Sequence, residues 1–171
     1  MTIIEESAAS AVSATITNVF DLFTKRGSEE RRSRELHAKT LVAALAPIVA
    51  DLRMLEERQS TKRWKKRVGT LYSALDELRP VLPPQWHHLK GSIRDSVGSA
   101  IGGGIVFVDL ISVPNDATLE PRSRWTMHAA DYLDETCRAV RVWGTTRSNR
   151  HARRQTCLSF NTWVNQHNLQ H

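Results

Sequence analysis

The first candidate for chemistry is phosphate binding by arginine close to the C-terminus. Residues 1–135 contain 18 Lys and Arg and 18 Asp and Glu, whereas residues 136–171 contain no acid, so the whole excess of +6 lies in the last 36 residues. A guanidinium group binds two phosphate oxygens at once, and a row of such contacts gives salt-dependent affinity for nucleic acid. The sequence predicts a polyanion-binding surface formed by six arginines: Arg138, Arg141, Arg147, Arg150, Arg153 and Arg154.

A second basic cluster, at residues 62–67, surrounds Trp64 with five positive charges. Its lysines Lys62, Lys65 and Lys66 would extend the polyanion-binding surface if the fold brought the two clusters together. Trp64 shares its helical register with a stripe of leucines, and a large aromatic residue in such a stripe normally lies in the core rather than stacking on a base. Because no known nucleic-acid-binding motif is present, the charge pattern is the main support for this function.

Histidines next to carboxylates suggest metal binding or acid–base catalysis. His128, Asp131 and Glu135 are spaced to share one helical face, which could hold a metal or pair a base with its orienting acid. One helix offers too few ligands for a metal site, however, and no H-E-x-x-H spacing occurs. A solvated polar face accounts for the same three residues, and His87 and His88 are better explained as the start of a helix.

Nucleophilic catalysis and phosphate-loop chemistry also lack their companion residues. Cys137 and Cys157 are too few for a disulfide framework or a structural zinc site. No G-x-S-x-G or S-x-x-K motif frames a serine. Residues 105–109 resemble an apolar strand followed by a magnesium-binding acid, but the G-x-x-x-x-G-K-[ST] loop is missing. We therefore expect a non-enzymatic protein with no catalytic residue, metal or cofactor.

A glycine-rich stretch at residues 96–113 carries a single charge, Asp109. Gly98 and Gly102 have the spacing that lets membrane helices approach closely, so a membrane-active helical protein is a weaker alternative. The stretch is too short and too interrupted for a typical membrane span, which favours a buried helix of a soluble bundle. Residues 102–113 also resemble a strand, but because no second strand-like run is present to pair with them, we expect a helix.

The elements that would position these residues are helices. The first apolar stripe, at intervals of three and four residues, consists of Val12, Ile16, Val19, Phe20 and Phe23. Gly27 is a typical residue after a helix end, and Ser28 followed by two glutamates is typical of a helix start. The sequence therefore predicts a helix–turn–helix junction at Gly27 and Ser28.

Two further segments have heptad-like stripes, which pack helices at shallow angles. The first is Leu41, Leu45, Ile48, Leu52 and Leu55, and the second is Trp64, Val68, Leu71, Leu75, Leu78 and Leu82. The register changes between them, which predicts a turn capped by Ser60 or Thr61, with one long bent helix as the alternative. Pro47 should kink its segment or mark its start. Prolines at positions 80, 83 and 84 should end the later segment.

Two helices and a short C-terminal element follow. The fourth helix should begin near Gln85, with a stripe of Trp86, Leu89, Ile93, Val97 and Ile101. After a loop at residues 114–121, the fifth should be closed by Gly144 and carry Trp125, Ala129, Tyr132, Thr136, Val140 and Trp143. Residues 158–164 could form a short amphipathic helix. If this tail docks on the bundle, Phe160 and Trp163 should anchor it; otherwise both are exposed to a partner.

The predicted fold class is therefore all-α, with a bundle of about five helices at residues 1–144 and a basic C-terminal extension with a short helix at residues 145–171. A chain of 171 residues can bury such a core. Acids in Met1–Glu6 are unlike a signal peptide, so we expect a cytoplasmic location. The favoured function is an interaction or assembly module that binds a protein partner or itself. The alternative is binding of nucleic acid or another polyanion.

Overall fold

Helices dominate the part of the chain that the computed structural model describes. The described backbone covers residues 4–54, 59–101, 118–119 and 122–169, and the described side chains cover residues 25–54, 62–101, 122 and 124–169. The longer helices are α1 (Ile4–Arg53), α2 (Thr61–Leu78), α3 (Leu89–Ile101) and α5 (Ser123–Thr145). The shorter ones are the 3-10 turn η1 (Pro84–Trp86), α6 (Asn149–Ala152) and α7 (Phe160–Gln166). The all-α fold class is confirmed.

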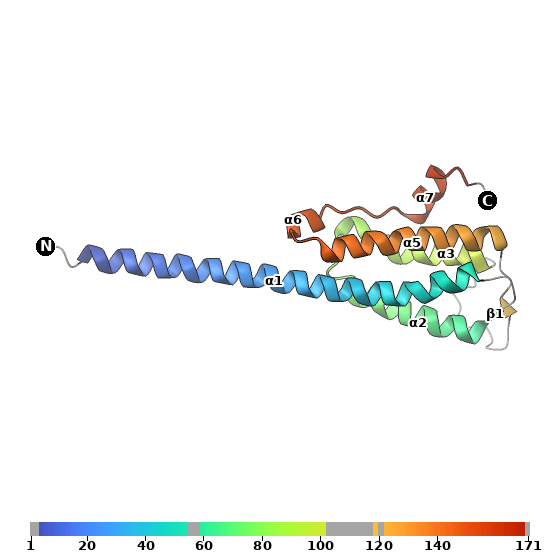
Figure 1. Cartoon of the computed structure of the whole chain (residues 1–171), viewed down its shortest axis with the longest axis horizontal. Helices are drawn as coiled ribbons and strands as arrows, with labels where there is room; N and C mark the ends of the chain where they lie inside the picture. Colours follow the sequence, from blue (N-terminus) through green and yellow to red (C-terminus); the bar gives the residue numbers. More distant parts are fainter. Residues whose placement is uncertain (1–3, 55–58, 102–117, 120–121, 170–171) are drawn as a thin grey trace.

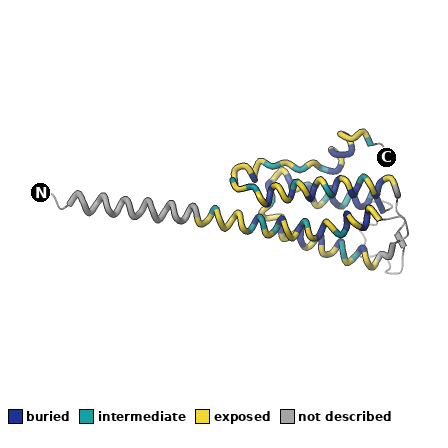
Figure 2. Tube along the Cα trace, in the orientation of Figure 1, coloured by how far each residue is buried: buried dark blue, intermediate teal, exposed yellow. Residues whose placement is uncertain are grey.

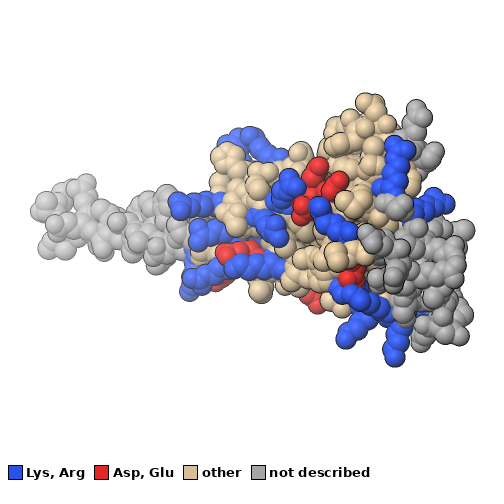
Figure 3. Space-filling model, turned by 45° about the vertical axis from the view of Figure 1, so that its right-hand side comes forward, with Lys and Arg blue, Asp and Glu red and all other residues tan. Residues whose placement is uncertain are grey.

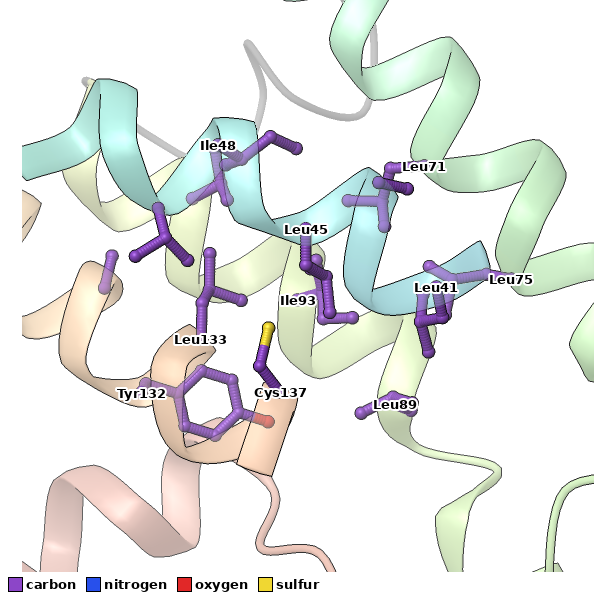
Figure 4. Close-up of a cluster of buried hydrophobic side chains, with 14 of the residues drawn as sticks. Leu41, Leu45, Ile48, Leu71, Leu75, Leu89, Ile93, Tyr132, Leu133 and Cys137 are labelled. Carbon is purple, nitrogen blue, oxygen red and sulfur yellow. The ribbon is translucent and has the colours of Figure 1, made fainter. Parts of the chain in front are cut away.

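The bundle is built around the second half of α1. This half packs against α5 and α2, and α3 packs against α5 so that all four helices surround one core (Figures 1 and 4). The first half of α1 extends beyond the other helices (Figure 1). At the far end of the bundle, β1 (Gln59–Ser60) and β2 (Thr118–Leu119) form a two-residue antiparallel ladder. The ladder lies in a segment that the sequence analysis predicted to be loop.

The apolar stripes predicted for the second half of α1 and for α2, α3 and α5 form the core. Leu41, Leu45 and Ile48 of α1 have no exposed surface. They face leucines of α2 and α3, and Tyr132 and Leu133 of α5, within one cluster (Figure 4). The buried positions follow the inner side of every helix in the bundle (Figure 2). The heptad-like spacing was therefore a correct guide to the core, except that Leu82 is only partly buried and lies beyond the end of α2. Leu55 lies outside the described residues.

The predicted junction at Gly27 and Ser28 is wrong, because α1 continues unbroken from Ile4 to Arg53. The Ser28 hydroxyl donates to the Lys25 carbonyl inside the helix instead of capping a new one. One glycine costs an exposed helix about 1 kcal/mol, less than the loss of several backbone hydrogen bonds at a break. The helix also continues through Pro47, since its neighbours Leu45 and Ile48 are held by the core.

The predicted ends of α2 are confirmed. This helix begins at Thr61, after a break that follows Arg53, and it ends at Leu78, before the first of the three prolines. The next regular helix begins at Leu89, four residues later than predicted, because the prolines first lead into the 3-10 turn η1. The strand-or-helix question at residues 102–113 lies outside the described residues.

Gly144 has a different role from the predicted one. It lies inside α5, which continues to Thr145, and it is buried against α1. A Cβ atom at this position would be 2.4 Å from the Cβ of Ala38. The glycine therefore allows α1 and α5 to approach closely, whereas the sequence analysis assigned it to the end of the helix.

The C-terminal extension docks on the bundle along α3 and α5. Phe160, Trp163 and Val164 of α7 are buried. The indole nitrogen of Trp86 donates to the Gln155 carbonyl at 2.8 Å, and the Tyr132 hydroxyl donates to the Leu158 carbonyl at 3.0 Å. The predicted anchors Phe160 and Trp163 are thus confirmed, while the division into two domains at Gly144 stays a prediction.

Candidate polyanion-binding surface

Arg34 joins the basic tail to α1. Its side chain is only 4% exposed, and its nitrogens donate to the carbonyl oxygens of Trp143 and Thr146 and to Asn149 Oδ1. Burial lowers the pKa of Arg34, and the negative charge of Glu30 opposes this shift. A guanidinium stays charged at neutral pH even so. Arg34 therefore satisfies the carbonyl end of α5 and fixes the position of α6 with one buried cation.

Glu30 makes a second connection between the same elements. Its carboxylate accepts from Asn149 Nδ2 at 2.9 Å and pairs with Arg153 at 3.3 Å. Asn149 consequently bridges Glu30 and Arg34, one helical turn apart on α1. The arginine-rich tail lies directly against residues 27–34 of α1, although more than 110 residues separate the two segments in the sequence.

This docking gathers positive charge around the point where α1 leaves the bundle. We call residues 25–35 of α1 and residues 145–155 of the tail the basic collar. The collar contains nine Lys and Arg and three Glu, which matches the net charge of +6 of the whole chain. Two of these acids are engaged, Glu30 by Arg153 and Glu35 by Lys39. Blue side chains crowd this end of the described surface in Figure 3.

Most cations of the collar are available to a ligand. Within the part of the chain that the structure describes, seven of them are exposed and have no carboxylate within ion-pair distance. They are Lys25, Arg26, Arg31, Arg32, Arg147, Arg150 and Arg154. Arg31 and Arg147 line the same surface hollow, together with Gly144, Thr145 and Glu35, whose carboxylate pairs with Lys39. A linear polyanion could therefore contact α1 and the tail at once.

The predicted lysines of α2 lie elsewhere. Lys62, Lys65 and Lys66 are in the first turns of α2, where Arg63 and Arg67 pair with Asp51 at 2.8 and 2.7 Å. Asp51 is near the end of α1, and a rise of 1.5 Å per residue places it roughly 30 Å from Arg31. The structure thus separates the two basic clusters that the sequence analysis considered joining. Trp64 between these lysines is fully buried, as predicted.

The two predicted arginines of α5 are also outside the collar. Arg138 pairs with Asp134 at 3.3 Å, and Asp134 also forms an ion pair with Arg53. Arg141 is exposed and lies beside Lys39 along an apolar groove between α1 and α5. Of the predicted polyanion-binding residues, the structure therefore brings together only the four arginines of the tail.

The histidine and carboxylates of α5 have separate tasks. Asp131 pairs with Arg53 at 3.2 Å, and Glu135 accepts from the indole nitrogen of Trp163 at 2.9 Å. His128 lies edge-on to Trp125, with ring centroids 5.6 Å apart, and burial lowers its pKa. No cluster of three or more potential metal ligands is found among the described residues.

Neither cysteine is activated as a nucleophile. Burial raises the pKa of the Cys137 thiol to about 11 and that of the Cys157 thiol to about 11. The thiolate is the reactive form, and both groups therefore remain protonated at neutral pH.

The sequence analysis missed the contribution of α1 to the collar, namely Lys25, Arg26, Arg31 and Arg32. It treated residues 1–135 as one balanced segment, and the acids elsewhere concealed the local run Arg31-Arg32-Ser33-Arg34. A shorter counting window would have found this run. The contact with the tail has no local signal, because it depends on Arg34 and Glu30 meeting residues far away in the sequence.

Comparison with known proteins gives no further lead: the chain matches no family model, and no significant match is found among curated proteins or solved structures. No helix in the described parts of the chain has the length and apolar character needed to cross a bilayer.

Proposed function

We propose that the chain is a non-enzymatic helical assembly module, in which the bundle holds one long helix whose first half contacts another protein chain. Helix α1 has 50 residues, which gives a length of about 75 Å at 1.5 Å per residue. Among the described residues, its contacts with other elements begin near Gly27, where α6 lies against it. The first half extends past the bundle (Figure 1).

The composition of this half supports a contact role. The spacing of Val12, Ile16, Val19, Phe20 and Phe23 places five large apolar residues on one face of the helix. Full burial of one such side chain is worth about 1.5–3 kcal/mol relative to exposure. An apolar face of this size, on a helix segment with no other described element beside it, is typical of an interaction surface.

A polar segment separates this face from the core. Between Phe23 and Ala38 the only large apolar residue is Leu36, which is 65% exposed. Helix α1 therefore carries two apolar segments joined by a charged one. The second segment is covered by the bundle of this chain, which leaves the first to be covered by another chain.

Self-association is the simplest form of this proposal, and light scattering after size-exclusion chromatography tests it. We expect the intact chain to have at least twice its monomer mass of 19.4 kDa at high concentration. The double variant Val19→Glu/Phe23→Glu should be a monomer, because charges on the apolar face prevent its burial. Leu36→Glu is the matched control, since it replaces an exposed apolar residue of the same helix. A monomeric intact chain at high concentration would contradict self-association.

Polyanion binding by the basic collar is the second candidate function. It is favoured by the docking of the tail on α1, which brings exposed arginines of the tail close to exposed cations of α1, with Arg31 and Arg147 lining one hollow. Binding to mixed single- and double-stranded nucleic acid should weaken linearly in a log–log plot against salt, with a slope of about 0.9 per phosphate contact on duplex DNA.

Two pairs of substitutions test whether the collar is responsible. Arg150→Ala/Arg154→Ala should reduce the salt slope, because these side chains are exposed and have no ion pair among the described residues. Lys62→Ala/Lys66→Ala removes the same charge at the other end of the bundle and should change the slope less. Absence of binding at low salt, or equal effects of the two pairs, would argue against the collar as the binding surface.

A further inference from the structure

An apolar groove runs between α1 and α5 beside the basic collar. It has a volume of about 420 Å³. Its apolar lining comes mainly from small side chains, and two cations and one acid also line it. The apolar residues of interest are Val42, Ala43, Ala46 and Gly144, and the charged ones are Glu35, Lys39 and Arg141.

The groove results from the close packing of the two helices. Gly144 approaches Ala38 too closely for any side chain at position 144. Ala43 and Ala46 are exposed on the adjoining face of α1, and a methyl group is too short to fill the space between two helices. An apolar helix from another chain could therefore insert larger side chains there, the usual mode of helix-in-groove recognition.

We infer that this groove receives the first half of α1, residues 4–24, from a second copy of the chain. The inference rests on the proposed assembly function and identifies its receiving surface. Residues 1–24 contain three acids, Glu5, Glu6 and Asp21, and no Lys or Arg. Lys39 of the groove pairs with Glu35 at 2.8 Å, so the positive charge offered to the segment comes from Arg141 and from the adjoining basic collar. The segment and the groove thus match in both charge and apolar character.

The segment cannot reach the groove of its own chain. Residues 4–24 and the groove residues of α1 belong to the same unbroken helix, so the segment points away from the groove along the helix axis (Figure 1). Folding back would require breaking α1 between Phe23 and Ala38. Only the segment of another copy can occupy the groove while the helix stays intact.

A matched pair of substitutions on one helix tests the inference. Ala43 lies in the groove and Ala50 lies outside it, and both are exposed positions of α1. Ala43→Glu should abolish the dimer or raise its dissociation constant at least tenfold, because the charge would meet an acidic segment and an apolar stripe. Ala50→Glu should leave the dimer unchanged. Thermal unfolding of both variants at a dilution that separates the copies verifies that the bundle remains folded.

The outcomes separate the inference from the proposed function. A dimer that survives Ala43→Glu but not Val19→Glu/Phe23→Glu would overturn the groove and leave assembly in place. A monomeric intact chain would overturn both self-association and the groove. Loss of the dimer in Ala43→Glu, with the dimer retained in Ala50→Glu, supports the inference.

Cross-linking gives a second measurement that does not depend on affinity. Chains with Val19→Cys and chains with Ala43→Cys are mixed and treated with a bismaleimide long enough to span one helical turn. Both native thiols have a pKa raised to about 11 by burial, so they react slowly near neutral pH. A covalent dimer in the mixture, and not in either variant alone, supports the inference. A non-covalent dimer with no cross-link in the mixture would overturn it.

Discussion

The two halves of α1 have similar apolar spacing and different surroundings. In the second half, Leu41, Leu45 and Ile48 face α2, α3 and α5 and are fully buried (Figures 2 and 4). The first half has a comparable stripe, but no other described element lies beside it (Figure 1). Periodicity therefore identifies an apolar face of a helix, while the chain's topology decides whether the same chain covers it. This difference carries the proposed assembly function.

The largest expected effect is the contrast between a core residue and a stripe residue. Leu45→Ala should lower the free energy of unfolding by about 2–5 kcal/mol, because it leaves a cavity in the core. Phe20→Ala should change the same quantity by less than about 0.5 kcal/mol at a dilution that separates the copies. Urea unfolding followed by circular dichroism measures both. Equal losses in dilute solution would mean that the two halves of α1 are buried alike within one chain.

Gly144→Ala tests the close contact that holds the second half of α1 to α5. Its new methyl group would lie 2.4 Å from the Ala38 Cβ, and overpacking of this kind costs about 1–3 kcal/mol. Gly69→Ala is the control, because the same change on α2 meets nothing within 4 Å and should stabilise the helix by up to about 1 kcal/mol. Ala38→Gly in the same chain should restore part of the loss. Equal thermal shifts for both glycines would contradict the close approach.

Arg34→Ala acts at the border between the two halves. It removes hydrogen bonds to Trp143, Thr146 and Asn149, and buried acceptors left without partners cost about 1–3 kcal/mol. Amide exchange of residues 147–154 should accelerate, while exchange in α2 should remain unchanged. Arg32→Ala removes an exposed cation two residues away and serves as the control. If the amides of residues 147–154 exchange at the same rate in both variants, Arg34 does not position α6.

The smallest expected effect is at Gly27, where alanine should increase the free energy of unfolding instead of lowering it. The residue lies within a continuous helix, and a Cβ there would meet only Asn149 Nδ2, at 4.0 Å. Gly27→Ala should therefore increase stability, by at most about 1 kcal/mol. A helix end with positive φ at this position would instead be destabilised by alanine. A small increase in the melting temperature supports one continuous α1, and a decrease would favour a break between the two halves.

The sequence predicted the elements whose signals are local. The leucine stripes, the break before Thr61 and the proline stop after Leu78 all follow from spacing and residue type. Gly27 misled the analysis because a good capping sequence also fits within a long helix. The prediction for Gly144 missed its role for a different reason, because the residue that requires glycine there is Ala38, over 100 residues away.

Only the tail half of the basic collar could be predicted from the sequence, because the other half depends on contacts between distant segments. The tail arginines are evident from composition, because no acid interrupts them. The cations of α1 join them only through Arg34, Glu30 and Asn149, which are polar contacts between distant segments. Such contacts leave no periodic pattern in the sequence. The proposed functions and the cytoplasmic location remain predictions that solution experiments must test.

Amide hydrogen exchange as a function of protein concentration tests the central claim most directly, because it reports on both halves of α1 in one sample. Residues 38–52 should be protected at every concentration, since the bundle of the same chain covers them. Residues 4–24 should exchange rapidly in dilute solution and become protected as the concentration rises and a second copy covers the stripe. Exchange of residues 4–24 that does not change with concentration would contradict assembly through the first half of α1.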